Sequence, residues 1–245
     1  NGATKVNTFV STNIGISSGM TAQNLVNNNV STLNGESSGM NTTNLVTSNL
    51  TMKQPFSSYS FNFDQGASDY FNCSNVSVLQ NASVITWNLW VNFHTRDFNI
   101  VFGKALNTTD VMQFYTWGSG AGYFWLKTAG SPVTAYISSL VPGRVALNEW
   151  AMFTIVFDGS QSGNDRLKIY QNGGTTNIIT SYSGTTPATL PNTTDDFFIG
   201  RGYNGYFNGQ ISNFAIWDSV LNNDDRINLY NNGVPQDLNN FRIQP

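Results

Sequence analysis

Aromatic and amide side chains beside glycine-rich turns are the residues in this sequence best suited to recognising another molecule. Tyrosine and tryptophan rings stack on the apolar C–H faces of sugars, while amide and guanidinium groups hydrogen-bond to polar atoms. The segment 201–206 (RGYNGY) gathers both kinds of group in one short stretch. The candidate carbohydrate-binding residues are Trp117, Tyr123, Trp125, Arg201, Tyr203, Asn204 and Tyr206. The alternative is that these tyrosines pack across a hairpin and bind nothing.

Oxygen-bearing side chains in predicted turns form a second candidate site. Calcium ions prefer carboxylate and carbonyl oxygens as ligands. The candidate ligands are Asp64, Asp69, Asp158, Asn164 and Asp165. No contiguous calcium-binding loop is present, and the same residue types also cap the backbone N–H groups of turns. The sequence therefore leaves both a calcium site and simple turn capping open.

Catalytic chemistry has little support in the sequence. Hydrolysis of a glycosidic bond normally needs two carboxylates on one face, yet the only glutamates are Glu36 and Glu149. His94 is the only histidine, and we expect it to be solvated or hydrogen-bonded rather than part of a triad. Cys73 is the only cysteine, so no disulfide forms within the chain, and we expect a buried, inert thiol. We therefore expect a protein that is not an enzyme.

The composition limits the classes of partner. The chain has 245 residues, of which 40% are hydrophobic and 13% aromatic, which is enough to build the core of one β-rich domain. Only 10% are charged, and the 11 lysines and arginines are scattered, which argues against nucleic acid as a partner. No apolar stretch is long enough to span a bilayer, so membrane insertion is not expected. The first residues lack the apolar core of a signal peptide, although a targeting segment removed by processing stays open.

The elements that would position the candidate residues are short strands. Stretches rich in aromatic and β-branched residues alternate with glycine-containing turns. The predicted strands cover residues 60–64, 84–93, 100–103, 112–116, 123–127, 151–157, 167–170, 197–200 and 211–218. Since no parallel crossover pattern is visible, this arrangement predicts an all-β fold with two packed antiparallel sheets, a jelly-roll sandwich.

One short helix is predicted after the last strand. Asn222 is placed to cap its first turn, and Asp224 and Asp225 lie where the helix dipole favours negative charge. Gly233 is a suitable left-handed stop. The apolar side of the helix would be formed by Leu221, Ile227, Leu229 and Tyr230. A helix of this length must pack on the sheets to be stable.

The order of these motifs resembles the laminin-G-like branch of the concanavalin A-like jelly-roll families. The segment 61–64 (FNFD), followed by Asp69 and Tyr70, is similar to the opening strand of such domains. The segment 148–160 (NEWAMFTIVFDGS) resembles their central tryptophan strand and its Asp-Gly turn, and 167–173 (LKIYQNG) resembles the next hairpin. With 198–200 and the closing strand and helix, the resemblance covers residues 59–233. It departs at Ala151 and Met152, where many relatives carry histidines.

The resemblance implies a concanavalin A-like jelly roll, but it does not choose a function. Relatives of this fold include lectins, adhesion modules, pentraxin-like binders and glycan-cleaving enzymes. The family often binds calcium through turn carboxylates and carbonyls, which is the reason for carrying calcium as the one candidate cofactor. Domains resembling this one are also frequent in structural proteins of marine bacteriophages.

The first fifty or so residues contain a repeat. The sequence SSGM at 17–20 and NLV at 24–26 recur at 37–40 and 44–46, an offset of 37 minus 17, or 20 residues. Two copies are too few for a solenoid, and each has little apolar surface, so we expect two similar extended arms or turns. The alternative is a floppy linker. The chain is thus divided into an N-terminal arm (1–53), a jelly roll (54–237) and a C-terminal tail (238–245).

These features together predict a structural protein on the exterior of an assembly. The low charge, the abundant amides, the repeated arm and the compact jelly roll fit a subunit on the exterior of an assembly, and the resemblance to phage structural proteins implies a virion surface or appendage protein. Its arm would bind other structural proteins or other copies of this chain, and its lectin-like jelly roll would attach to host-cell glycans. The alternative is a secreted or cell-surface carbohydrate-binding adhesin, with a glycan-cleaving enzyme less expected. The expected location is the virion surface or the extracellular space.

Overall fold

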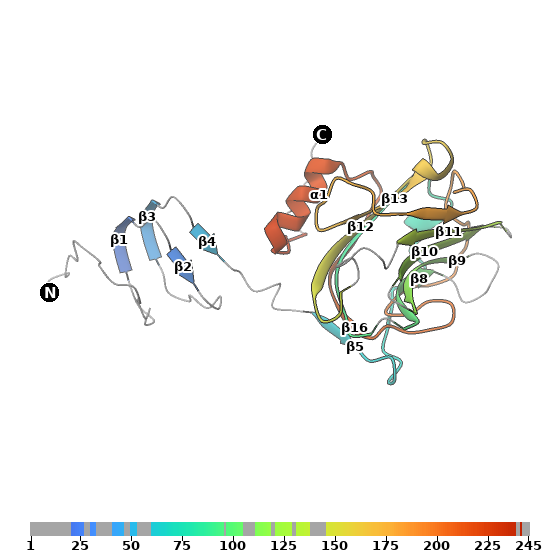
Figure 1. Ribbon diagram of the computed structural model, residues 1–245, viewed down its shortest axis with the longest axis horizontal. Helices are drawn as coiled ribbons and strands as arrows, with labels where there is room; N and C mark the ends of the chain where they lie inside the picture. The colour runs from blue at the N-terminus through green and yellow to red at the C-terminus, as the bar shows by residue number, and fades with distance from the viewer. Residues whose placement is uncertain are drawn as a thin grey trace. The chain divides into compact units, whose positions relative to one another are not determined.

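The chain divides into two units, Asn1–Pro55 and Phe56–Pro245. The computed structural model describes residues 21–26, 30–32, 41–46, 50–52, 60–95, 97–104, 111–118, 121–128, 131–137, 146–238 and 241. The second unit contains both large sheets and the α-helix (Figure 1).

The second unit is a sandwich of two antiparallel sheets. One sheet has five strands in the order β13 (Leu167–Gln171), β12 (Trp150–Asp158), β7 (Val84–Phe93), β16 (Gly209–Trp217) and β5 (Phe61–Phe63). The other has seven strands in the order β14 (Ser181–Ser183), β11 (Ser131–Ile137), β10 (Ala121–Thr128), β9 (Val111–Trp117), β8 (Asn99–Lys104), β15 (Phe197–Ile199) and β6 (Phe71–Asn72). The predicted all-β jelly-roll fold is confirmed. Short 3₁₀ turns lie at Ser77–Leu79 (η1), Gly163–Arg166 (η2) and Asn231–Gly233 (η3).

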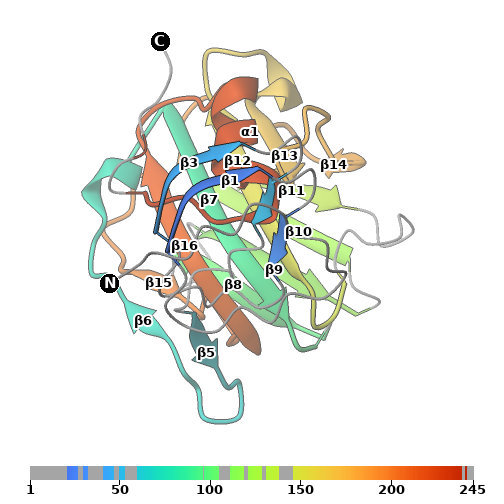
Figure 2. The same cartoon turned by 90° about the vertical axis from the view of Figure 1, so that its left-hand side faces the viewer.

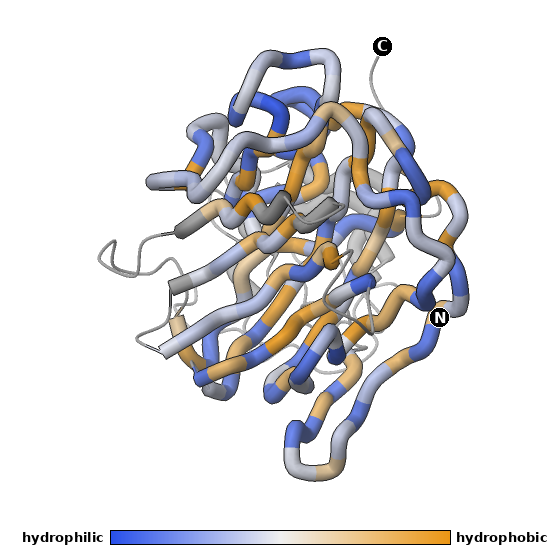
Figure 3. The backbone as a smooth tube through the Cα atoms, turned by 90° about the vertical axis from the view of Figure 1, so that its right-hand side faces the viewer, coloured by the Kyte–Doolittle hydropathy of each residue, from blue (hydrophilic) through white to orange (hydrophobic). Residues whose placement is uncertain are grey.

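The core lies between the two sheets. Along β7, every second side chain belongs to it, as the two-residue period of a strand requires: Ile85, Trp87, Leu89, Val91 and Phe93. The ring of Trp87 stacks on Phe102 of β8 with centroids 6.1 Å apart and lies 5.6 Å from Phe124 of β10. Because the side chains of a strand alternate, the remaining β7 side chains face away from the core. Figure 3 shows hydrophobic residues concentrated along the strands and hydrophilic ones in the turns.

The outer face of the five-stranded sheet is covered by helix α1 (Asn223–Tyr230) (Figures 1 and 2). Trp90 of β7 stacks on Tyr230 with ring centroids 5.6 Å apart. The smaller cluster beneath the helix consists of Trp90, Met152, Leu221 and Leu229, with Trp150, Trp217, Tyr230, Leu238 and Phe241 packed against it. No helix in the described ranges is long and apolar enough to cross a membrane.

The ends of α1 confirm one expectation and correct two. The Asn222 side chain accepts from the backbone N–H of Asp225, and the Asp225 carboxylate accepts from that of Asn222, which is a reciprocal capping box. The helix ends at Tyr230 and its C-cap is Asn231, whose φ of 43° is left-handed, so Gly233 is not its stop. Ile227 is 48% exposed and does not join the apolar side, because a helix this short presents only a narrow stripe to the sheet.

In the first unit, the two copies of the repeat pair with each other. β1 (Thr21–Val26) pairs in parallel with β3 (Asn41–Val46), and β2 (Val30–Thr32) pairs in parallel with β4 (Leu50–Met52). The paired residues of the two copies are always 20 positions apart, as in Leu25 with Leu45 and Val30 with Leu50. We expected two similar extended arms or turns and not a solenoid, but a constant period brings equivalent residues into register, and the described strands pair in parallel as in a solenoid.

Candidate functional site

The candidate site is built on the outer face of the seven-stranded sheet. On β10, Phe124 and Leu126 are fully buried in the core, while the alternating Tyr123 and Trp125 are half-buried and point the other way. The antiparallel register places Tyr123 opposite Tyr115 of β9, and their rings stack with centroids 5.1 Å apart. A row of aromatic side chains thus lies on the face of the sandwich that α1 does not cover.

A short connection between β15 and β16 lies over this face. Arg201 and Tyr206 form an isolated antiparallel bridge, and the N–H of Gly202 donates to the carbonyl of Gly205 at 3.2 Å. A Cβ at Gly202 would come within 2.7 Å of both Gln113 Oε1 and Ile100 Cγ2, and one at Gly205 within 2.6 Å of Cε1 of Phe98. The two glycines therefore let the backbone of this connection approach the sheet closely.

Gln113 of β9 anchors the connection. Its side chain is only 1% exposed, and its Oε1 accepts from the backbone N–H of Tyr203 at 3.2 Å. Its cross-strand neighbour is Gly103 of β8, where a Cβ would lie 2.9 Å from Gly202 Cα. The register of β8 against β9 shifts between Ile100 and Phe102, and such bulges commonly re-aim side chains beside functional sites. The seat for 201–206 is thus part of the sheet itself.

This seat brings Tyr203 to Trp125. Their ring centroids are 6.5 Å apart with planes at 77°, an edge-to-face contact. Asn204 is exposed beside them. A second ring group begins at Trp117, which is 56% exposed and packs on Phe98 with centroids 5.0 Å apart. The ring centroid of Phe98 in turn lies 5.7 Å from that of Tyr115, so Phe98 links Trp117 to the stacked tyrosines.

Arg201 extends toward the other side of the face. Its guanidinium carbon lies 4.9 Å from the ring centroid of Tyr70, 5.1 Å from that of Phe198 and 5.4 Å from that of Tyr206. Tyr206 thus contacts Tyr70 and Arg201, whereas Tyr203 contacts Trp125. The tyrosines of RGYNGY diverge to different parts of the sheet instead of only packing across their own hairpin.

All seven predicted carbohydrate-binding residues therefore lie on β9, β10 or the connection over them. Three residues that hold them together were missed in the sequence: Phe98, Gln113 and Tyr115. The alternation along β9 could have assigned Tyr115 to the face of Trp117. The role of Gln113 depends on which residue lies opposite it, so no local pattern indicates it.

The predicted calcium ligands lie in two different turns. In the turn between β5 and β6, Asp64 Oδ1 accepts from the N–H of Gly66 at 2.8 Å, and Asp69 Oδ2 accepts from the N–H of Asp64 at 3.0 Å. In the second turn, Asn164 Oδ1 accepts from the N–H and the hydroxyl of Thr186 at 2.8 and 3.0 Å. These side-chain oxygens are hydrogen-bonded to groups of the protein, mainly backbone N–H groups, as in turn capping.

Asp158 is the most heavily hydrogen-bonded carboxylate of the second turn, which also holds Asp165. It accepts from the N–H and hydroxyl of Ser160 at 3.0 and 2.6 Å and from Gln161 Nε2 at 2.9 Å. Partial burial alone would raise the pKa of Asp158, but these hydrogen bonds outweigh it and lower the pKa. Within the described ranges, no group of three or more His, Cys, Asp or Glu side chains could hold a metal ion.

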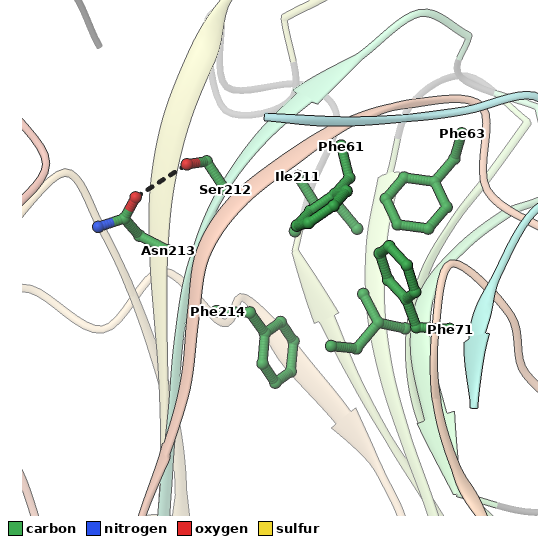
Figure 4. A pocket seen from close by; sticks show the side chains of 8 residues that line it. Phe61, Phe63, Phe71, Ile211, Ser212, Asn213 and Phe214 are labelled. Atoms are coloured by element: carbon green, nitrogen blue, oxygen red, sulfur yellow. Dashed lines mark hydrogen bonds between the residues drawn. The ribbon is translucent and has the colours of Figure 1, made fainter. Parts of the chain in front are cut away.

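A separate cavity of about 350 Å³ opens at the edge of the sandwich between β5, β6 and β16. It is lined by Phe61, Phe63, Phe71, Ile199, Ile211, Ser212, Asn213 and Phe214. Figure 4 shows Phe61, Phe63 and Phe71 gathered together, with Ser212 and Asn213 apart from them. The Ser212 hydroxyl donates to Asn213 Oδ1 at 2.8 Å. The mostly apolar lining of this cavity suits a polyhydroxylated ligand less well than the aromatic face does.

The three residues considered for catalysis, Cys73, His94 and Glu149, lie outside both the aromatic face and the cavity. Cys73 is exposed directly after the edge strand β6, so the expected buried thiol is wrong, although partial desolvation raises its pKa. Only its backbone is tied down, since its N–H donates to the carbonyl of Phe197 at 2.9 Å. His94 and Glu149 are also exposed. The structure gathers none of these three on the aromatic face.

The fold and the open aromatic face define a lectin-like sandwich, and the sequence gives its family. Residues 65–227 match the family model of the concanavalin A-like lectin/glucanases superfamily, in its laminin G group. This match spans more than half of the chain, and the chain belongs to this family. A search of curated proteins finds no match.

Solved structures share the fold at low sequence identity. The CBM40 of the Ruminococcus gnavus IT-sialidase is 12% identical with a TM-score of 0.55, and the alignment covers 70% of this chain and 96% of that one. The NanB sialidase of Streptococcus pneumoniae is 13% identical with a TM-score of 0.53, over 69% of this chain but 27% of that one. Likeness at this identity shows the fold alone.

Proposed function

We propose that the Phe56–Pro245 unit is a non-catalytic carbohydrate-binding module whose ligand lies across the outer face of the seven-stranded sheet. The observation that carries this proposal is the contact between Trp125 and Tyr203, with Trp117 and the Tyr115–Tyr123 stack beside it on the same face. Half-buried rings offer flat apolar surface to a sugar, and their polar edges and Asn204 offer hydrogen bonds.

The rings are held in place before any ligand arrives. Gln113 and the two glycines fix the Tyr203 backbone, and the edge-to-face contact fixes its ring against Trp125. Side chains that are already ordered lose less conformational entropy on binding, which favours affinity. The outer face of the other sheet lacks this opportunity, because α1 and its apolar cluster occupy it.

A non-catalytic role is supported by the acidic residues. The contacts of Asp64, Asp69 and Asp158 are those of turn caps, and glycoside hydrolysis needs a pair of carboxyl groups flanking the scissile bond. The sialidase CBM40 is a structure of the same fold that carries a binding-module name, which agrees with this reading.

The proposal is tested on a glycan array with the full chain and two matched variants. Trp117→Ala removes a ring on the proposed face that is 56% exposed, and Phe61→Ala removes one at the sheet edge that is 61% exposed. The proposal expects Trp117→Ala to weaken binding about 10-fold or more, as for other exposed stacking contacts, and Phe61→Ala to leave it unchanged. Equal effects of the two variants, or no glycan bound by the wild type, would overturn it.

We further propose that the module is carried by a virion surface or appendage, with the Asn1–Pro55 unit attaching it to neighbouring structural proteins. The low charge of the chain and the in-register strands of that unit support this, since each described strand there pairs on one edge only. A secreted or cell-surface adhesin is the alternative. Deleting residues 1–53 distinguishes them: loss of incorporation into particles with glycan binding intact supports the structural role, and unchanged incorporation contradicts it.

A further inference from the structure

We infer that the ligand of this face carries an anionic group, a carboxylate or a sulfate, and that Arg201 binds it. This inference rests on the proposed carbohydrate-binding function and adds the chemical class of the ligand. Three observations support it. The Arg201 guanidinium has no hydrogen-bond acceptor among the described residues, three aromatic rings surround it, and it lies on the same face as the aromatic row.

The Arg201 guanidinium has no hydrogen-bond acceptor and no acidic partner among the described residues. The contrast with the other well-placed arginines is clear. Arg166 donates to the carbonyls of Gly159, Gln161 and Thr186, and Arg226 donates to the carbonyl of Leu221 and to Asn223 Oδ1. An arginine has five N–H donors in a planar fork, so those of Arg201 remain for a ligand or water.

The three rings around Arg201 hold it without neutralising it. Contacts of Tyr70, Phe198 and Tyr206 with the guanidinium carbon are all between 4.9 and 5.4 Å, within the range of cation–π attraction. Such contacts fix the plane of the guanidinium but leave its charge and its edge donors available. A fixed planar fork suits the two oxygens of a carboxylate or sulfate better than a single hydroxyl.

The position of Arg201 fits an extended ligand. Trp125 lies opposite Gln113, Gln113 opposite Gly103, and Gly103 opposite Phe198, in one row across four neighbouring strands. At about 4.8 Å between strands, the row is roughly 14 Å long. The 201–206 connection covers the middle of this row, at Gln113 and Gly103. A sugar ring stacked on Trp125 at one end and an anionic group at Arg201, above Phe198, at the other therefore requires an oligosaccharide that passes over this connection.

The charge of the rest of the chain makes this arginine decisive. The formal net charge is −3, so the protein as a whole does not attract anions. Selectivity for an acidic glycan would thus depend on the local site and not on a broad basic surface.

The test uses the full chain and oligosaccharides of one backbone in neutral, carboxylated and sulfated forms. We expect acidic forms to bind more tightly than the neutral form, and Arg201→Gln to reduce their binding about 10- to 100-fold, the loss expected for a charge-assisted bidentate contact. Arg201→Lys should restore only part of it. Lys168→Gln, which removes one positive charge from β13, is the matched control and should change binding less than 2-fold.

The outcomes separate this inference from the function on which it rests. A preference for carboxylated over sulfated forms, or the reverse, identifies the anionic group. Neutral and acidic forms that bind equally, or an Arg201→Gln variant that loses both alike, would overturn the inference and leave carbohydrate binding standing. Binding of none of the glycans would overturn both. Thermal melting of Arg201→Gln, expected within a few degrees of wild type, shows that loss of binding is not loss of fold.

Discussion

Trp125 and Tyr203 meet edge-to-face, with ring centroids 6.5 Å apart, although one lies in the middle of a strand and the other in a connection that crosses the same sheet. We call the rings of Trp125, Tyr203, Trp117, Tyr115 and Tyr123 the aromatic platform. If a sugar binds on this platform, the rings of Trp125 and Tyr203 are both needed. We predict that Trp125→Ala and Tyr203→Ala each weaken glycan binding about 10- to 100-fold, while Tyr203→Phe, which keeps the ring, retains most of it. Calorimetric titration of each variant measures this, and a Tyr203→Phe variant as weak as Tyr203→Ala would mean that the hydroxyl, not the ring, binds.

A methyl group at Gly202 should displace the platform. Its Cβ would lie 2.7 Å from Gln113 Oε1 and Ile100 Cγ2, so the connection must lift from the sheet. We predict that Gly202→Ala abolishes measurable binding and costs about 1 to 3 kcal/mol of unfolding free energy, as overpacking commonly does. Gly66→Ala is the control, because its Cβ would lie 3.2 Å from one carboxylate oxygen of Asp64. Normal binding by Gly202→Ala would show that the connection is not part of the site.

How far the sequence predicts this protein is seen by comparing β7 with β11. β7 has the predicted bounds, since seven of its ten residues (VITWNLWVNF) are aromatic or β-branched. β11 (Ser131–Ile137) was missed; its sequence SPVTAYI contains a proline, which a local reading takes as evidence against a strand. Likewise, the residues that form the platform were predicted by type, but Gln113 and Gly103 matter only through the cross-strand register.

The repeat shows a different limit. The 20-residue offset was recognised, yet pairing between the copies was not expected because only two were counted. The same offset also relates Val6 to Val26, Val10 to Val30 and Gly15 to Gly35, which extends the repeat in the sequence to three copies. Three copies are the number at which repeat stacking becomes favourable, and counting them would have predicted the parallel register.

Lys104 is a buried cation whose loss should destabilise the sandwich. Its side chain is 2% exposed, and its Nζ donates to Asn75 Oδ1 at 2.8 Å and to the carbonyl of Asp195 at 2.7 Å. Burial lowers its pKa, and the charges of Asp195 and Asp196 oppose that shift. Lys104→Ala removes the donor to the carbonyl of Asp195, while Asn75 Oδ1 keeps its hydrogen bond from Gln80 Nε2. We predict that this variant, which also leaves a cavity, costs about 1 to 3 kcal/mol in urea unfolding.

The control for this prediction is Lys168→Ala on β13. Lys168 is only half-buried, so its removal should cost less than about 0.5 kcal/mol. If the two variants are equally stable, the hydrogen bonds of Lys104 contribute nothing to the fold.

The Asp158 turn should make stability depend on pH in the acidic range. The pKa of Asp158 is below its ordinary value of 3.8, so the folded state binds the proton less readily than the unfolded state does. The resulting stabilisation is present in full above pH 3.8 and is lost as pH falls through the lower, folded pKa. We predict that Asp158→Asn lowers the melting temperature at pH 6 but has a much smaller effect near pH 2. A difference between the two proteins that is constant with pH would contradict this.

Hydrogen–deuterium exchange of the full chain, with and without an oligosaccharide selected on the glycan array, tests the central claim most directly. The proposed binding face predicts ligand-dependent protection in residues 111–117, 121–128 and 201–206, with no change in α1 or in the turn 158–165. Protection confined to β5, β6 and the Phe61 cavity, or to the turns that hold Asp64 and Asp158, would show that the ligand binds elsewhere on this fold.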